Sequence, residues 1–159
     1  MMQLYFVLDP ATDPLVICFL QEHLDDMRKV SPPESVHALD VEKLRQPDIR
    51  FWTAWMQQPE GPALVGTCAL KQLDAAHVEL KTMRVQGAYR GSDAAQRILA
   101  HVLDEARASG VERISLETGT EPFFTPARRF YARNGFELCE PFGSYQLDPH
   151  SCFMTRAIR

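Results

Sequence analysis

One junction, at residues 78–103, constrains the fold more than any other stretch of the chain: a β-favouring run, a basic glycine turn and a helical pattern follow one another. Val78, Leu80 and Val85 belong to the extended run, and residues 86–92 supply the turn. Apolar residues then recur at helical spacing, at Ala95, Ile98, Leu99, Val102 and Leu103. Because the first turn of a helix presents backbone N–H groups without intrahelical acceptors, the junction predicts an anion site, for phosphate above all.

The remaining segments predict one domain over residues 1–159. Pro14, with Asp13 as its cap, begins a helix that ends near Lys29, and helical turns around residues 41–45 have Asp40 as their cap. The other expected helices are the one after the glycine turn and one at 126–134; the expected strands are 3–8, 50–55, 63–70, 77–85, 111–117, 136–139 and 152–158. Three of these strands form an antiparallel meander into the glycine turn, and a β-α-β unit follows it.

Composition limits the classes of function. A formal net charge of −4 and a pI near 5.7 argue against a general nucleic-acid binder. No apolar run approaches the ~20 residues of a membrane span, and the amino terminus has no basic region followed by a long apolar core, so we expect a cytoplasmic protein without a membrane partner. The four cysteines are far apart with no C-x-x-C pair, which predicts buried free thiols and no metal site.

Two ordered motifs resemble those of one enzyme family. Arg90-Gly91-Ser92-Asp93-Ala94-Ala95 resembles the acetyl-coenzyme A signature of the GNAT superfamily of N-acetyltransferases, Gln/Arg-x-x-Gly-x-Gly/Ala. Arg90 and Ala95 fit this pattern, whereas Asp93 stands where the family has a glycine. Downstream, Tyr131 to Phe136 resembles the family's Tyr-x-x-x-Gly-Phe segment. The resemblance implies a GNAT fold of the α/β (α+β) class: a mixed, mostly antiparallel sheet of about six to seven strands with helices on both faces.

A narrower resemblance covers residues 79–85, 116–119, 141–145 and 152–154, which are similar to the small bacterial acetyltransferases labelled as indole-acetic-acid-type (IAA-type). Phe124 departs from the family, many of whose members place an asparagine there. The resemblance implies acetyl-CoA as co-substrate and no metal. The residues it implies for cofactor binding are Met83, Arg84, Val85, Arg90, Gly91, Ser92, Asp93, Ala94, Ala95, Arg97, Phe124 and Tyr131.

Acetyl transfer requires a base for the amine and an acid for the departing thiolate. By resemblance Tyr131 is the candidate acid. For the base, His77 and Glu79 share one face of their strand, and Glu117 stands at the end of the next strand, where sites form in open α/β sheets. We prefer Glu79, because it lies in the segment that resembles the subgroup. Glu117 is the alternative base. A further alternative is that either glutamate has a purely structural role, in a pair with Lys81 or Arg113.

The chain is therefore predicted to be an N-acetyltransferase that moves an acetyl group from acetyl-CoA to a small amine in a ternary complex. The alternative is a GNAT-fold acyl-CoA-binding or regulatory module that has lost turnover because of Asp93; an acyl-CoA enzyme with a longer acyl group or a hydroxyl acceptor is a further rival. We expect Asp93 to point to solvent at a backbone φ above zero, with Arg90 or Arg97 offsetting its charge. Residues 34–51 and 141–150 are expected to line the acceptor site. A homodimer is left open.

Overall fold

The computed structural model describes residues 3–35 and 41–158. Its elements are β1 (Tyr5–Leu8), α1 (Pro14–Val30), η1 (Pro33–Ser35), α2 (Val41–Leu44), β2 (Ile49–Gln58), β3 (Gly61–Asp74), β4 (His77–Val85), η2 (Gly87–Tyr89), α3 (Ala94–Ala108), β5 (Arg113–Gly119), η3 (Pro122–Phe124), α4 (Thr125–Arg133), β6 (Glu137–Leu138) and β7 (Ser151–Ala157). The strands form one mixed seven-stranded sheet in the order β1-β2-β3-β4-β5-β7-β6. No helix in these two ranges is long and apolar enough to cross a membrane.

The predicted elements are present, with different ends in several cases. Asp13 caps α1 by accepting a hydrogen bond from the amide of Leu15 at 2.9 Å, as expected. The hairpin strands β2 and β3 are longer than predicted, because their antiparallel pairing continues past the apolar pattern as far as Gln58 and Gly61. In contrast, β6 contains only Glu137 and Leu138, both exposed at the edge of the sheet. The predicted cap Asp40 lies outside the described residues.

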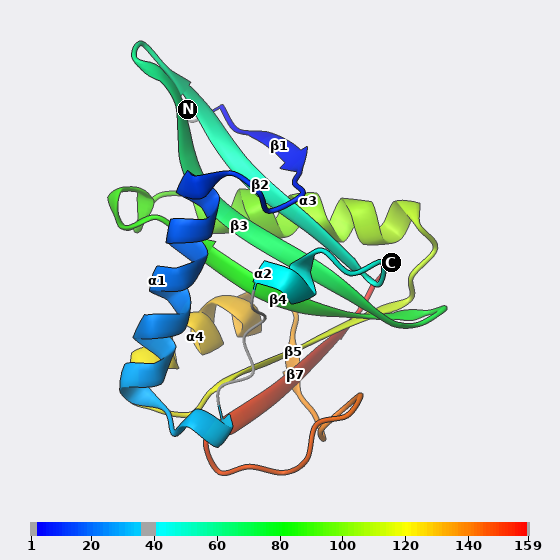
Figure 1. Ribbon diagram of the computed structural model, residues 1–159. Helices are drawn as coiled ribbons and strands as arrows, with labels where there is room; N and C mark the ends of the chain where they lie inside the picture. The colour runs from blue at the N-terminus through cyan, green and yellow to red at the C-terminus, as the bar shows by residue number, and fades with distance from the viewer. Residues whose placement is uncertain (1–2, 36–40, 159) are drawn as a thin grey trace.

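Helices cover both faces of the sheet (Figure 1). On one face α1 buries Val16, Phe19 and Leu20 against Phe51 and Leu64 of the hairpin. On the other face α3 packs on the sheet; its buried Ile98, Leu99 and Val102 join one cluster with Val78 and Leu80 of β4 and Ile114 and Leu116 of β5. Because side chains alternate along a strand, Glu79 and Glu117 face away from this cluster, toward the side of α1.

Strands β4 and β5 pair only at one end. Their parallel register runs from His77↔Arg113 to Leu80↔Leu116 and stops there. Directly afterwards β4 has an irregularity opposite β3, where Thr82 adopts a φ of 55° and its carbonyl accepts a hydrogen bond from Thr67 Oγ1 at 2.8 Å. Beyond this point the two strands diverge in Figure 1. The backbone of residues 81–85 is therefore not paired with β5.

The β-bulge at Thr82 also changes which side chains share a face. Before it, Val78 and Leu80 join the cluster under α3, and after it Met83 and Val85 pack against the same cluster. The alternation is thus shifted by one residue, and Arg84 turns to the side of α1, where its guanidinium lies 5.3 Å from the ring centroid of Phe19.

A loop covers the part of that face that α1 leaves open. Residues 141–150 pass over β4 and β7, and Phe142 and Tyr145 contact each other with ring centroids 5.2 Å apart. Tyr145 also packs against Phe153 at 5.4 Å, and Phe142 lies 5.9 Å from His77. This aromatic cluster holds the loop on the sheet, where a helix would otherwise be needed to cover it.

Candidate active site

The divergence of β4 and β5 opens a cleft of about 380 Å³, a volume suited to a small-molecule site. Six parts of the chain contribute to it: α1, β4, the turn before α3, the end of β5, the segment of η3 and α4, and the loop 141–150. Its lining residues are His23, Asp26, Met27, Glu79, Leu80, Lys81, Thr82, Met83, Arg84, Val85, Arg90, Leu116, Glu117, Thr118, Phe123, Phe124, Pro126, Ala127, Tyr131 and Tyr145. The three predicted catalytic residues, Glu79, Glu117 and Tyr131, thus line one cleft.

Tyr131 enters the cleft from α4. Its ring is held edge-on between Phe130 and Phe136, at centroid distances of 5.4 and 5.6 Å. Burial raises the pKa of the Tyr131 phenol above its usual range. The hydroxyl therefore keeps its proton at neutral pH, which is the state that a general acid requires.

Glu79 is almost fully buried, with 3% of its surface exposed. Its Oε2 forms an ion pair with Lys81 Nζ at 3.1 Å and accepts a hydrogen bond from the Tyr145 hydroxyl at 2.5 Å. Lys81 also donates to the Tyr145 hydroxyl at 2.9 Å. Two donors, one of them the Lys81 cation, thus already occupy Oε2 of the carboxylate, and an acceptor amine would have to compete with them.

Glu117 has a different environment in the same cleft. It accepts a hydrogen bond from Ser151 Oγ at 2.8 Å. Burial raises the pKa of Glu117 to about 7, and the carboxylates of Glu79 and Asp148 add to this effect, while the Ser151 bond and Lys81 oppose it. Two carboxylates in distinct environments are a common arrangement in acid–base sites, and the carboxylate with a pKa near neutrality is suited to be the base.

His77 faces the same side as Glu79, as predicted, but does not line the cleft. Its Nε2 lies 2.7 Å from Ser115 Oγ, which in turn lies 2.8 Å from Thr155 Oγ1. Burial lowers the pKa of His77. These contacts make His77 part of the packing between β4, β5 and β7.

The basic glycine turn leads into α3 as predicted. Gly91 adopts a φ of 80°, which a side chain would disfavour, and Arg90 beside it lines the cleft. Ser92 Oγ accepts a hydrogen bond from the amide of Ala94 at 3.2 Å. No described residue accepts from the amides of Ala95 and Gln96 in the first turn of α3. These free amides, together with the Arg90 guanidinium, fit the requirements of a pyrophosphate group.

Asp93 corrects one expectation. Its φ is −85° and not positive, because Gly91 makes the left-handed turn two residues earlier. Its exposed side chain makes no capping hydrogen bond, so the expected solvent-facing orientation is present. No ion pair between Asp93 and Arg90 or Arg97 occurs in the part of the chain that the structure describes; Arg97 instead buries its Nη1 without a partner and does not line the cleft.

The segment of β4 next to the turn fits the extended arm of a coenzyme. Met83 and Val85 line the cleft beyond the point where β4 leaves β5, so their backbone is available on that side. Arg84 lies between them in sequence, but its side chain forms an ion pair with Asp26 of α1 at 2.9 Å. The sequence motif placed Arg84 with the cofactor, whereas its side chain lies on the side of α1.

Phe124, where the family pattern has an asparagine, is buried at the edge of the cleft. Its ring occupies the space next to Gly119, and a Cβ at Gly119 would overlap it. Phe124 also contacts the exposed Phe123 edge-on, with centroids 5.0 Å apart. The apolar ring therefore replaces a polar side chain at this point and depends on the glycine for room.

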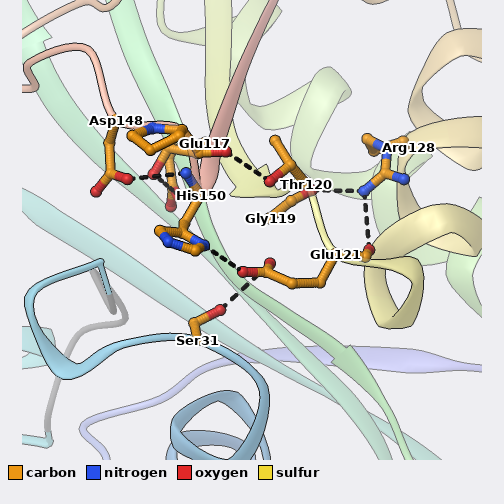
Figure 2. A network of polar contacts seen from close by, with 10 residues as sticks. Ser31, Glu117, Gly119, Thr120, Glu121, Arg128, Asp148 and His150 are labelled. Atoms are coloured by element: carbon orange, nitrogen blue, oxygen red, sulfur yellow. Dashed lines mark hydrogen bonds and ion pairs between the residues drawn. The ribbon is translucent and has the colours of Figure 1, made fainter.

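A polar network lies beside the end of β5 (Figure 2). Glu121 accepts hydrogen bonds from Ser31 Oγ at 3.4 Å and, through its other oxygen, makes an ion-pair contact with His150 Nδ1 at 2.8 Å. Arg128 donates to the carbonyls of Gly119 and Glu121 at 2.6 and 3.2 Å. The end of α1, the loop after β5 and the loop 141–150 are thus joined beside Glu117.

The contacts between some lining residues could not be predicted from the sequence. A pair between Lys81 and a glutamate was one of the alternatives, and Lys81 meets Glu79 on the same strand, but both meet Tyr145 only because the loop 141–150 folds over β4; Tyr145 is 64 positions from Lys81. Of the two segments expected to line the acceptor site, the loop contributes Tyr145, but none of residues 34–35 and 41–51 lines the cleft. Helix α1 supplies His23, Asp26 and Met27 in their place; residues 36–40 lie outside the described part.

Among the described residues, no group of three or more His, Cys, Asp and Glu side chains could hold a metal ion. The cysteines in this part of the chain are free, and only Cys68 is fully buried, while Cys18 is exposed; the prediction of buried thiols is therefore wrong for Cys18.

Comparison with known proteins agrees with the site. The profile of the acetyltransferase (GNAT) family matches residues 17–136. The chain is 45% identical over 155 residues to the uncharacterized N-acetyltransferase YsnE of Bacillus subtilis, covering 98% of this chain and 100% of that protein. It is 46% identical over 150 residues to the uncharacterized N-acetyltransferase YedL of Escherichia coli, covering 94% and 92%.

A protein named IAA acetyltransferase from Azospirillum brasilense is 36% identical over 140 residues, covering 87% of this chain and 86% of that protein, which gives the IAA-type subgroup only weak support. Among solved structures, an acetyltransferase of the GNAT family from Staphylococcus aureus has a TM-score of 0.72 at 22% identity, covering 99% of this chain and 100% of that one. The N-acetylglutamate synthase of Neisseria gonorrhoeae, in complex with coenzyme A and N-acetylglutamate, also has a TM-score of 0.72, at 17% identity, covering 100% of this chain and 36% of that one. The chain belongs to the GNAT acetyltransferase family and is an acyltransferase.

Proposed function

We propose that the protein transfers the acetyl group of acetyl-CoA directly to a small amine. The observation that carries this proposal is that Glu117, Tyr131 and, from the turn before α3, Arg90 line one and the same cleft. Bound acetyl-CoA supplies the acetyl group as a thioester. Arg90 and the first-turn amides of α3 would hold its pyrophosphate, and the unpaired backbone of Met83 and Val85 would hold its pantetheine arm.

The acid–base roles follow from the different surroundings of Glu117 and Glu79. Glu117 takes a proton from the ammonium group of the acceptor, because burial raises its pKa to about 7 and no residue of the described ranges holds it in an ion pair. The amine nitrogen attacks the thioester carbon, and as the C–S bond breaks Tyr131 would deliver its proton to the sulfur. The attacking nitrogen loses its second proton as the amide forms, and this proton would restore the Tyr131 hydroxyl. Glu79 holds Lys81 and Tyr145 in place. These assignments change our preference for the base from Glu79 to Glu117.

Isothermal titration with acetyl-CoA, followed by a thiol-release assay on a panel of amines, tests the proposal. We expect binding and amine-dependent release of coenzyme A. Binding without release for any amine or hydroxyl compound would support the alternative of a non-catalytic acyl-CoA-binding module. Release with longer acyl-CoA thioesters but not with acetyl-CoA, or only with hydroxyl compounds, would support the rival acyltransferases.

A further inference from the structure

One wall of the cleft contains polar atoms that lack partners. Five buried side-chain polar atoms among the described residues make no hydrogen bond, and three of them belong to residues that line the cleft: His23 Nδ1, Thr82 Oγ1 and Arg84 Nε. Such atoms are uncommon in folded proteins, and each one calls for an explanation. The three atoms are themselves shielded from solvent, and their concentration on the wall between α1 and β4 is the observation on which the inference rests.

The donor set defines what that molecule must present. Arg84 can only donate and is always positively charged. Its Nη2 holds Asp26 at 2.9 Å, and its side chain, which lines the cleft, is 15% exposed. Thr82 offers a hydroxyl, which can donate as well. A guanidinium with neighbouring neutral donors is suited to a carboxylate, because charge-assisted hydrogen bonds to that group are the strongest available in this set.

His23 and Thr82 are adapted to this role. Burial, followed by the charge of Arg84, lowers the pKa of His23 to about 4, so that its ring is neutral near pH 7 and adds no second positive charge; in the Nδ1–H tautomer its unpartnered nitrogen would donate to the carboxylate. Thr82 is β-branched and yet has a φ of 55°, a conformation that is an outlier for such a residue. Backbone outliers of this kind persist where the surrounding structure enforces them, frequently at ligand sites.

Glu117 lies on the β5 side of the same cleft, whereas Arg84 lies on the side of α1 and β4. On the basis of the acetyl transfer proposed above, we propose that the acceptor is an amino acid, whose amino group meets Glu117 and whose carboxylate is received by Arg84, His23 and Thr82. An amine without a carboxylate would leave the three atoms of the wall unpartnered. A polyamine would bring further positive charge to Arg84. Asp26 is then a competitor, because it occupies part of the guanidinium that the substrate needs.

A matched panel of acceptors tests the class of substrate. Each of the common amino acids is compared with its amide and with the amine formed by its decarboxylation, for example leucine, leucinamide and 3-methylbutylamine, in the thiol-release assay with acetyl-CoA. For the preferred side chain we expect kcat/KM to be about 10- to 100-fold higher for the amino acid, the size of a charge-assisted hydrogen bond. Equal or better rates with the decarboxylated amines overturn the inference while leaving the acetyl transfer intact. If none of the amino acids, amides or amines causes release of coenzyme A, both the acetyl transfer and the carboxylate subsite are refuted.

Two substitutions in the same ion pair separate substrate recognition from anchoring of α1. Arg84→Gln should lower the ratio of kcat/KM for the amino acid to that for the decarboxylated amine by at least about tenfold. Asp26→Asn should raise this ratio, since the guanidinium is no longer shared. A role in anchoring alone predicts that both variants slow all acceptors alike and leave the ratio unchanged, and this result would overturn the proposal. Circular dichroism and thermal unfolding confirm that each variant is folded, and Arg84→Lys, which keeps the charge, gives an intermediate ratio if the fork geometry is used.

Discussion

Replacement of Glu117 by glutamine is the sharpest test of the acid–base assignment, because it has consequences for both stability and rate. Burial raises the pKa of the Glu117 carboxyl from 4.5 to about 7. The folded protein therefore keeps this proton between about pH 4.5 and about pH 7, where the unfolded chain has lost it. Since the folded state binds more protons in this window, the free energy of unfolding decreases as the pH rises through it.

The shift sets the size of the effect. It corresponds to about 3 kcal/mol of unfolding free energy, lost between the two pKa values and constant above the higher one. Glutamine has nearly the same shape, retains an oxygen that accepts from Ser151, and does not ionise. We therefore expect the variant to gain stability relative to the wild type on going from pH 4.5 to pH 8, by up to about 3 kcal/mol. Urea denaturation at a series of pH values measures this difference.

Activity should change in the opposite direction. The pH profile of kcat/KM reports the pKa values of the essential groups in the free enzyme. In the wild type kcat/KM should rise through an apparent pKa of about 7 as Glu117 ionises. The glutamine variant should lose this acid limb and about 10²- to 10⁴-fold in rate. Glu79→Gln is the control and should retain the limb. A Glu117 variant with an unaltered limb and no change in the pH dependence of stability would refute the reasoning; loss of the limb in the Glu79 variant alone would make Glu79 the base.

Four further outcomes are expected. Tyr131→Phe should lower kcat by about 10²- to 10⁴-fold with little change in the Kd of acetyl-CoA measured by titration, and an unchanged kcat with a good acceptor would remove Tyr131 from the mechanism. Asp93→Gly should tighten acetyl-CoA several-fold, more at low ionic strength, because an exposed carboxylate beside the first turn of α3 repels phosphate; equal affinities at low and high salt would show that it does not. Lys81→Met should move the acid limb of kcat/KM to higher pH, because the charge of Lys81 lowers the pKa of Glu117, and an unmoved limb would contradict this coupling. Gly119→Ala should lower Tm, because the new methyl group overlaps Phe124, and Phe124→Ala in the same chain should recover part of the loss; an unaltered Tm would show that the loop accommodates the methyl group.

The spacing of residues along the chain was sufficient to predict most of the secondary-structure elements. The extended run, Gly91 and the apolar spacing of α3 predict a strand, a turn and a helix, because each depends on residues a few positions apart. The cap at Asp13 and the helix that carries Tyr131 are predicted for the same reason. Asp93 shows the limit even at this range: the sequence does not state which residue of the turn takes the positive φ, and the structure assigns it to Gly91.

The tertiary structure alone decided the direction and the charge state of the groups in the cleft. Arg84 faces α1 because the bulge at Thr82 shifts the alternation of β4 by one residue, and this shift depends on pairing with β3. His23 and Asp26 reach the cleft because α1 packs on the face of the sheet toward which Arg84 of β4 points. The pKa of Glu117, on β5, depends on burial and on the contributions of Ser151 from β7 and of Lys81 and Glu79 from β4. Contacts between residues so far apart in the chain have no local pattern, so only the folded chain determines them.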